Sequence, residues 1–151
     1  MEQKYNPMIE VINKKAKSLS ALYHGLASKA GISQSEFWVW YALLYMGGEY
    51  TQQSICDLWS FPRQTVNSVI SNMAKKGYVY LEPIPGTRNR KLIKLTEAGK
   101  EFGESIIERI YVAEQNAIER LSIQEQQECI RILDKYINFL MEELKADGKP
   151  L

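Results

Sequence analysis

Apolar residues near both ends of the chain recur at alternating intervals of three and four positions, which places them on one face of a helix. Near the N-terminus this seam consists of Ile9, Ile12, Ala16, Leu19 and Tyr23. Near the C-terminus it consists of Ile130, Leu133, Ile137, Leu140 and Leu144, a spacing typical of coiled coils. Because a single chain leaves such seams unpartnered, we expect a homodimer. We expect its dimerisation region to consist of residues 1–32 and 97–151. The predicted interface contains Ile9, Ile12, Leu19 and all five residues of the C-terminal seam.

A helix predicted over residues 34–46 is apolar on every side. Ser33 followed by Glu36 predicts a capping box at its start, and Gly47 and Gly48 end it. A helix without a polar face must be buried all round, so we expect it at the centre of the molecule. Its large side chains are Phe37, Trp38, Val39, Trp40, Tyr41, Leu43, Leu44 and Tyr45.

Two helices joined by a tight turn follow. Thr51 caps a short helix that ends near Trp59, and residues 60–62 form the turn. The second helix extends to Lys76 and stops at Gly77, which suits a left-handed C-terminal cap. Its inward stripe is Val66, Val69, Ile70 and Met73. Its outward polar residues are Gln64, Thr65, Asn67, Ser68, Ser71, Asn72 and Lys75.

After Gly77 the pattern changes from helical to extended. Residues 78–81 and 92–95 predict two short strands, separated by the turn formers Pro83, Pro85, Gly86 and Asn89. The predicted fold class is therefore mainly α with a small β-hairpin wing. We expect a winged helix-turn-helix lobe over residues 33–96, and a helical dimerisation region formed by the N- and C-terminal helices of one compact chain.

The charge is unevenly distributed, although the net charge is only +1. Residues 60–94 contain seven basic residues and one acid, Glu82, which gives this segment a charge of +6. Residues 97–147 contain twelve acids and six bases, which gives −6. A basic segment in a near-neutral chain is typical of a nucleic-acid-binding face, although a merely solvated surface can carry the same charge.

The predicted second helix and hairpin together suit DNA recognition. Such a helix enters the major groove, where short polar side chains reach base edges, while arginines at the hairpin tip reach the backbone or the minor groove. We assign Lys75 and Lys76 to phosphates. The predicted DNA-binding residues are Arg63, Gln64, Thr65, Asn67, Ser68, Ser71, Asn72, Lys75, Lys76, Arg88, Asn89, Arg90 and Lys91.

Four motifs in this region resemble the multiple-antibiotic-resistance-regulator (MarR) family. They are residues 36–43, Thr51-Gln52-Gln53, residues 62–67, and Leu95-Thr96-Glu97-Ala98-Gly99, within a resemblance that covers residues 33–100. The resemblance implies a sequence-specific transcription regulator, a repressor, that binds a palindromic operator on double-stranded DNA as a homodimer. It also implies that the terminal helices of two chains intertwine into a dimerisation domain.

The wing departs from the family's motif. In the family, the wing presents an aspartate-x-arginine element whose arginine is directed to the minor groove. Alignment backward from Leu95 places Thr87 at the aspartate position and Asn89 at the arginine position. Arg88 and Arg90 flank the missing arginine, and either could take its place.

Aromatic residues concentrate around the central helix, at Tyr23, Trp38, Tyr41, Tyr45 and Tyr111. Such residues form ordinary core in most proteins. The resemblance implies a second interpretation, a crevice for a small aromatic or apolar effector that releases the DNA. Two alternative functions also stay open: a DNA binder without an effector, and a winged helix used for protein–protein contact. The basic recognition helix and wing favour DNA, because a winged helix that binds protein more often has an exposed apolar face there.

Enzymatic chemistry finds little support in the sequence. His24 is the sole histidine, no cluster of side chains has metal-ligand spacing, and no glycine-rich phosphate loop is present. We expect no enzyme activity, no cofactor and no metal.

The sequence also predicts a cytoplasmic protein. Its longest uncharged apolar run, residues 37–46, is far shorter than the roughly 18 residues that a membrane span needs. The N-terminus lacks the layout of a signal peptide, and we expect no membrane partner. Cys56 and Cys129 are predicted to be reduced and buried. The peroxide-sensing branch of the resembled family has its reactive cysteine in the first helix, where this chain has none.

Overall fold

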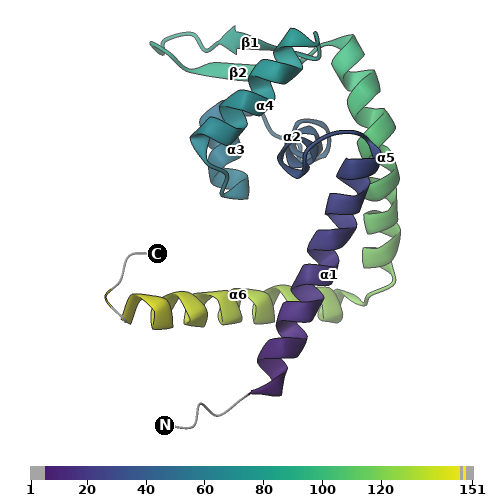
Figure 1. The fold of residues 1–151 in the computed structure, drawn as a ribbon, viewed down its shortest axis with the longest axis vertical. Helices are drawn as coiled ribbons and strands as arrows, with labels where there is room; N and C mark the ends of the chain where they lie inside the picture. Colours follow the sequence, from purple (N-terminus) through teal and green to yellow (C-terminus); the bar gives the residue numbers. More distant parts are fainter. Residues whose placement is uncertain (1–5, 147, 149–151) are drawn as a thin grey trace. The chain divides into compact units, whose positions relative to one another are not determined.

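The computed structural model describes residues 6–146 and 148 of the 151-residue chain. This part is mainly α with one antiparallel hairpin, which confirms the predicted fold class (Figure 1). The chain divides into two compact units at Arg109, within α5. The elements are α1 (Pro7–Lys29), α2 (Gln34–Tyr45), α3 (Gln52–Trp59), α4 (Arg63–Lys75), β1 (Val79–Pro83), β2 (Lys91–Leu95), α5 (Glu97–Glu119) and α6 (Ile123–Ala146).

Helix α2 is the centre of the first unit, as predicted. None of its residues is exposed, and it contacts α1, α3, α4 and β2. Phe37, Val39, Trp40 and Ala42 are completely buried. The all-round apolar pattern therefore has the predicted consequence: the helix-turn-helix is assembled on α2.

The predicted capping box at Ser33 is present only in its first half. The Ser33 hydroxyl accepts the Glu36 N–H at 3.1 Å, as expected. The Glu36 carboxylate, which is 6% exposed, accepts the Trp40 Nε1–H at 3.2 Å. A fully buried indole needs an acceptor, and Glu36 lies one helical turn away to supply it. Full capping boxes do form at Thr51 with Ser54 and at Ser122 with Glu125.

The turn between α3 and α4 depends on one left-handed residue. Ser60 has φ 53°, and the Phe61 N–H donates to the Cys56 carbonyl, which ends α3. Pro62 is then the N-cap of α4. The predicted inward stripe of α4, namely Val66, Val69, Ile70 and Met73, is buried, and this anchors the helix with its polar face outward.

The hairpin differs slightly from the prediction. β1 begins at Val79, because the Tyr78 N–H still donates to Met73 at the end of α4. Pro83, predicted as a turn residue, is the last residue of β1 and pairs with Lys91. A proline fits there because β1 is an edge strand and needs no N–H donor on its outer side.

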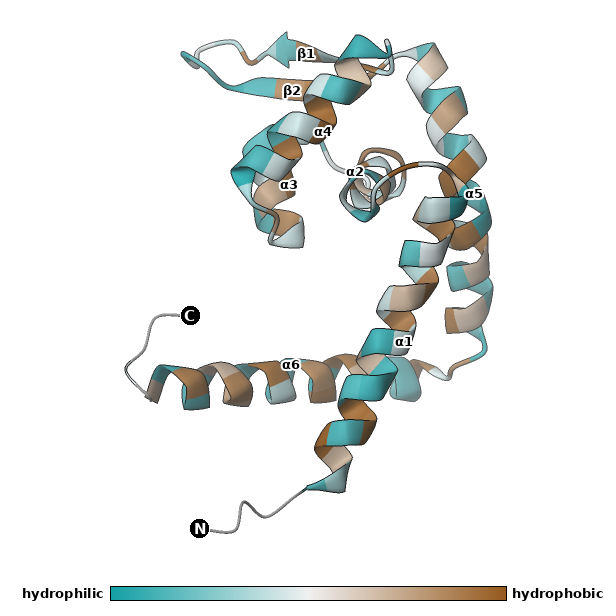
Figure 2. Ribbon diagram, in the orientation of Figure 1, coloured by the Kyte–Doolittle hydropathy of each residue, from teal (hydrophilic) through white to brown (hydrophobic). Residues whose placement is uncertain are grey.

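Helix α6 in the second unit has no buried residue in the described chain. Its predicted seam is exposed, from Ile130 at 62% to Leu144 at 45%. Figure 2 shows the hydrophobic residues distributed along the whole helix. Cys56 is buried as predicted, but Cys129 is exposed, because it lies on this unpaired helix. Within the described residues, no helix combines the length and the apolar character that a membrane span requires.

Candidate nucleic-acid interface

The outward face of α4 carries the predicted base-reading side chains. Gln64, Asn67, Ser68, Ser71 and Asn72 are exposed, as are Lys75 and Lys76 at the C-terminal end, whereas Thr65 is half-buried. These residues are held by the buried stripe on the opposite face, so their backbone positions are fixed by the core of the first unit. The polar face is therefore both rigid and accessible.

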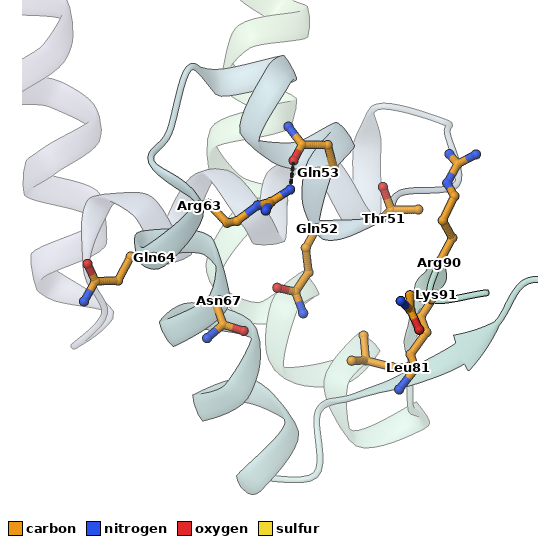
Figure 3. A pocket seen from close by; sticks show the side chains of 10 residues that line it. Thr51, Gln52, Gln53, Arg63, Gln64, Asn67, Leu81, Arg90 and Lys91 are labelled. Atoms are coloured by element: carbon orange, nitrogen blue, oxygen red, sulfur yellow. Dashed lines mark hydrogen bonds between the residues drawn. The ribbon is translucent and has the colours of Figure 1, made fainter. Parts of the chain in front are cut away.

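A groove with a volume of about 830 Å³ lies beside this face (Figure 3). Three of its lining residues are cations and none is an acid, so its field favours a polyanion. The residues come from the start of α3, the start of α4, and both strands of the hairpin with its tip: Thr51, Gln52, Gln53, Arg63, Gln64, Asn67, Leu81, Asn89, Arg90 and Lys91. Six of the predicted DNA-binding residues thus line one groove: Arg63, Gln64, Asn67, Asn89, Arg90 and Lys91.

The tip of the hairpin is organised by Thr87. Its hydroxyl donates to the Ile84 carbonyl at 2.7 Å, and its N–H donates to the same oxygen at 3.3 Å. The Ile84 N–H donates to the Arg90 carbonyl, which closes the tip. Arg88 and Arg90 are both exposed, but only Arg90 lines the groove.

The base of the wing is fixed to the rest of the first unit. The Ile93 N–H donates to the Tyr50 carbonyl at 2.8 Å, and Lys94 of β2 forms an ion pair with Glu49. This pairing raises the pKa of Lys94, chiefly through the hydrogen bond to Glu49. The strand that follows the arginines of the tip is thus bonded to the segment that leads into α3.

The groove residues at the start of α3 were not predicted from the sequence to bind DNA. Thr51, Gln52 and Gln53 line the groove, and the Arg63 guanidinium donates to Gln53 Oε1 at 2.9 Å. The available signal was their position: polar residues just after the N-cap of the first helix of the motif lie near the start of the second helix.

The predicted aromatic residues of the first unit do come together. Trp38 lies 4.7 Å from Tyr23 and 5.5 Å from Tyr41 between ring centroids, and Tyr45 lies 6.2 Å from Tyr41. Trp59, which was not predicted to belong to this cluster, lies 4.8 Å from Trp38 between ring centroids. The fifth predicted residue, Tyr111, belongs to the second unit.

The cluster contains one unsatisfied donor. Trp59 Nε1 is buried and has no hydrogen-bond partner among the described residues. A buried donor without an acceptor is costly, because it loses its hydrogen bonds to water and gains none in the protein.

Similar solved structures are transcription regulators. NMB1585, a MarR family regulator from Neisseria meningitidis, superposes with a TM-score of 0.78 at 21% identity, covering 96% of this chain and 100% of that one. The chain has the fold of the MarR regulators. S. aureus MepR in its DNA-binding conformation has a TM-score of 0.72 at 19% identity, with 88% and 98% covered. PcaV from Streptomyces coelicolor, in complex with its natural ligand, has a TM-score of 0.59 at 19% identity, and the match covers 82% of this chain and 89% of that one.

A match to a sequence-family model is consistent with the MarR fold. The model described as "Sugar-specific transcriptional regulator TrmB" matches residues 26–98, which include α2, α3, α4 and the hairpin. No curated protein matches the chain. The resemblance to the MarR family is thus confirmed for the fold. Fold and family match together support a DNA-binding transcription regulator, and the matched proteins are regulators by their descriptions.

Proposed function

We propose that the protein is a transcription regulator that binds an inverted repeat in double-stranded DNA as a homodimer. The observation that carries this proposal is the acid-free groove between the polar face of α4 and the hairpin. A winged helix used for protein–protein contact would expose apolar side chains on the recognition helix. Here the exposed face of α4 is polar along its length, which favours DNA.

The proposed contacts divide into two kinds. Gln64 and Ser68 are exposed on α4, and their amide and hydroxyl groups suit base edges in the major groove. Lys75 and Lys76 at the end of α4 suit phosphates. On this division Gln64 and Ser68 set the sequence preference, whereas the lysines set the affinity and its dependence on salt.

The homodimer is proposed from the unpaired seams. Ile9 and Leu19 of α1 are 51% and 58% exposed, and Ile137 and Leu140 of α6 are 50% and 47% exposed. Contiguous apolar surface of this kind marks an interface in a soluble protein. A second copy offers the same seams, and a two-fold dimer would present two copies of α4 to two half-sites about one helical turn, roughly 10 base pairs, apart.

We also propose that the regulator is a repressor released by a small aromatic compound. The aromatic cluster joins Tyr23 of α1 to Trp38 of α2 and Trp59 of α3, so it connects a proposed dimerisation helix to the helix-turn-helix. The unsatisfied Trp59 Nε1 favours an effector with an acceptor oxygen. PcaV, whose structure was solved in complex with its natural ligand, offers a ligand-bound example of the fold.

The test measures binding to the promoter region upstream of the protein's own gene, by gel shift and by fluorescence anisotropy. We expect saturable binding to one inverted repeat, with affinity that falls steeply as salt is raised. Lys75→Ala should weaken binding to all duplexes alike and reduce the salt slope by about one unit, whereas Gln64→Ala should change base preference. Binding no tighter to that region than to random duplex would contradict the proposal.

A further inference from the structure

Among the described residues, Arg63 is the cation of the groove whose side chain is hydrogen-bonded to a neighbouring helix. It is the first residue of α4, and its Nη2–H donates to Gln53 Oε1 of α3 at 2.9 Å (Figure 3). Gln53 Nε2–H in turn donates to Asp57 Oδ1 at 2.9 Å, one helical turn along α3. The three side chains form a chain of hydrogen bonds that crosses the turn of the motif.

The chemistry of the two ends fixes the direction of this chain. A guanidinium can only donate hydrogen bonds, and a carboxylate can only accept them. The Gln53 amide therefore has one orientation that satisfies both neighbours, with its oxygen toward Arg63 and its nitrogen toward Asp57. Because the Arg63 group has five N–H donors, four remain for a ligand in the groove.

Fold stability does not explain a cation at this position. The N-terminus of a helix carries a partial positive charge, so a cation there is unfavourable. The first turn of α4 contains no acid, and Pro62 supplies no side-chain cap. Arg63 thus adds positive charge where the helix least tolerates it, which is expected if the charge serves a bound anion.

The neutral amide between the two charges matters for such an anion. An acid in direct contact with Arg63 would orient it but also neutralise it, and would place a negative charge in the groove. Gln53 orients the guanidinium and leaves its charge available, while Asp57 is not among the groove's lining residues.

We propose that Gln53, anchored by Asp57, is a positioning residue that holds Arg63 ready to bind a phosphate of the DNA backbone. The proposal rests on the proposed DNA-binding function. A phosphate is favoured over a base edge because the guanidinium is held back against α3 rather than extended from the tip of α4. Holding a long side chain in its bound conformation lowers the entropy cost of binding.

The experiment is a double-mutant cycle measured by fluorescence anisotropy on the wild-type operator and on a random duplex. Arg63→Ala should weaken binding to both duplexes by roughly 10-fold and lower the slope of affinity against salt concentration by about one unit. Gln53→Ala should weaken binding to both duplexes by roughly 2- to 10-fold, which corresponds to the entropy cost of ordering one long side chain. In the Arg63→Ala background, Gln53→Ala should have no further effect, because Gln53 acts only through Arg63.

Further variants separate positioning from a direct contact or a folding defect. Gln53→Glu keeps an acceptor for Arg63 but neutralises it, so it should weaken binding more than Gln53→Ala. It also replaces the bond to Asp57 with a contact between two carboxylates, so its melting temperature is measured in parallel to separate loss of binding from loss of stability. Asp57→Ala should weaken binding, whereas Asp57→Asn, which keeps an acceptor, should restore it. Arg109→Ala, which removes an exposed arginine outside the groove, is the matched charge control.

The outcomes distinguish this proposal from the proposed function. Wild-type protein that binds no duplex DNA would overturn the function itself. If the wild type binds and Arg63→Ala weakens it, but Gln53→Ala has no effect, the positioning role is wrong. If Gln53→Ala causes the same loss with and without Arg63, Gln53 contacts DNA directly and the positioning role is again wrong.

Discussion

At the scale of single residues, Gly99 shows how a local motif fixes the wing to the helices. The Thr96 hydroxyl donates to the Gly77 carbonyl at 2.6 Å and accepts the Gly99 N–H at 3.0 Å. The first turn of α5 therefore lies directly against the residue that ends α4. A Cβ at position 99 would lie 1.9 Å from the Tyr78 carbonyl oxygen, so only glycine fits there.

We predict that Gly99→Ala destabilises the fold by about 1–3 kcal/mol or more, because the contacted atom is backbone and cannot turn away. Chemical denaturation measures the change. Gly25→Ala is the matched control. Gly25 lies inside α1, a Cβ at this position would have no atom within 4 Å, and the substitution should stabilise the fold by about 0.5–1 kcal/mol. Equal unfolding free energies for the Gly99 variant and the wild type would contradict the packing argument.

At the scale of elements, the hairpin carries two arginines with different surroundings. Arg90 directly precedes β2 and lines the groove, whereas Arg88 is exposed at the tip and does not. Arg90 therefore suits a backbone phosphate and Arg88 suits the narrow minor groove of A·T-rich DNA. We propose that Arg88 and Arg90 together take the role of the arginine that the family motif has where this chain has Asn89.

We predict that the double variant Arg88→Ala/Arg90→Ala loses at least roughly 10-fold in operator affinity, equivalent to about 1.4 kcal/mol. Arg88→Ala alone should reduce the preference for A·T-rich flanks, whereas Arg90→Ala alone should weaken all duplexes alike. Competition binding with A·T-rich and G·C-rich flanking sequence separates the two. Unchanged binding by the double variant would show that the wing does not touch DNA.

The sequence predicts elements better than it predicts contacts between them. Periodicity placed α2 at the centre and fixed the inward stripe of α4, because burial of one face repeats along a helix. It did not predict the bond from Arg63 to Gln53 or the addition of Trp59 to the aromatic cluster, since these contacts cross a turn and leave no periodic trace. Burial of Cys129 was predicted from residue type alone, and it was wrong for the described chain because α6 is unpaired.

At the scale of the whole molecule, the apolar seams predict the state of association. Ile137 lies in the middle of the α6 seam and is half exposed. We predict that Ile137→Asp shifts the protein toward monomer or unfolding, because an unpaired charge in the interface costs more than the roughly 2–5 kcal/mol of a lost leucine. Light scattering at micromolar concentration measures the change. Glu128→Gln, on the same helix, is the control. A stable wild-type monomer would contradict the dimer.

The last prediction concerns the coupling of the aromatic cluster to DNA binding. Tyr23, Trp38 and Trp59 link α1, α2 and α3, so a compound inserted among them would alter the attachment of the helix-turn-helix to a dimerisation helix. In the proposed dimer, two copies of α4 bind two half-sites at once, and a shift of a few ångströms in their spacing would lose one of them. A coupling of about 1–3 kcal/mol is sufficient for regulation.

We therefore expect salicylate-like aromatic acids to quench tryptophan fluorescence and weaken operator binding over the same concentration range. The carboxylate or phenol oxygen should accept the Trp59 Nε1–H, so an aromatic compound without an acceptor oxygen should bind more weakly. Trp59→Phe keeps an aromatic side chain, although a smaller one, and removes the donor, so it should reduce this discrimination without changing DNA affinity in the absence of compound. If no compound changes both signals, and Trp38→Ala alters stability alone, the cluster is core, and the regulator responds to something other than an aromatic ligand.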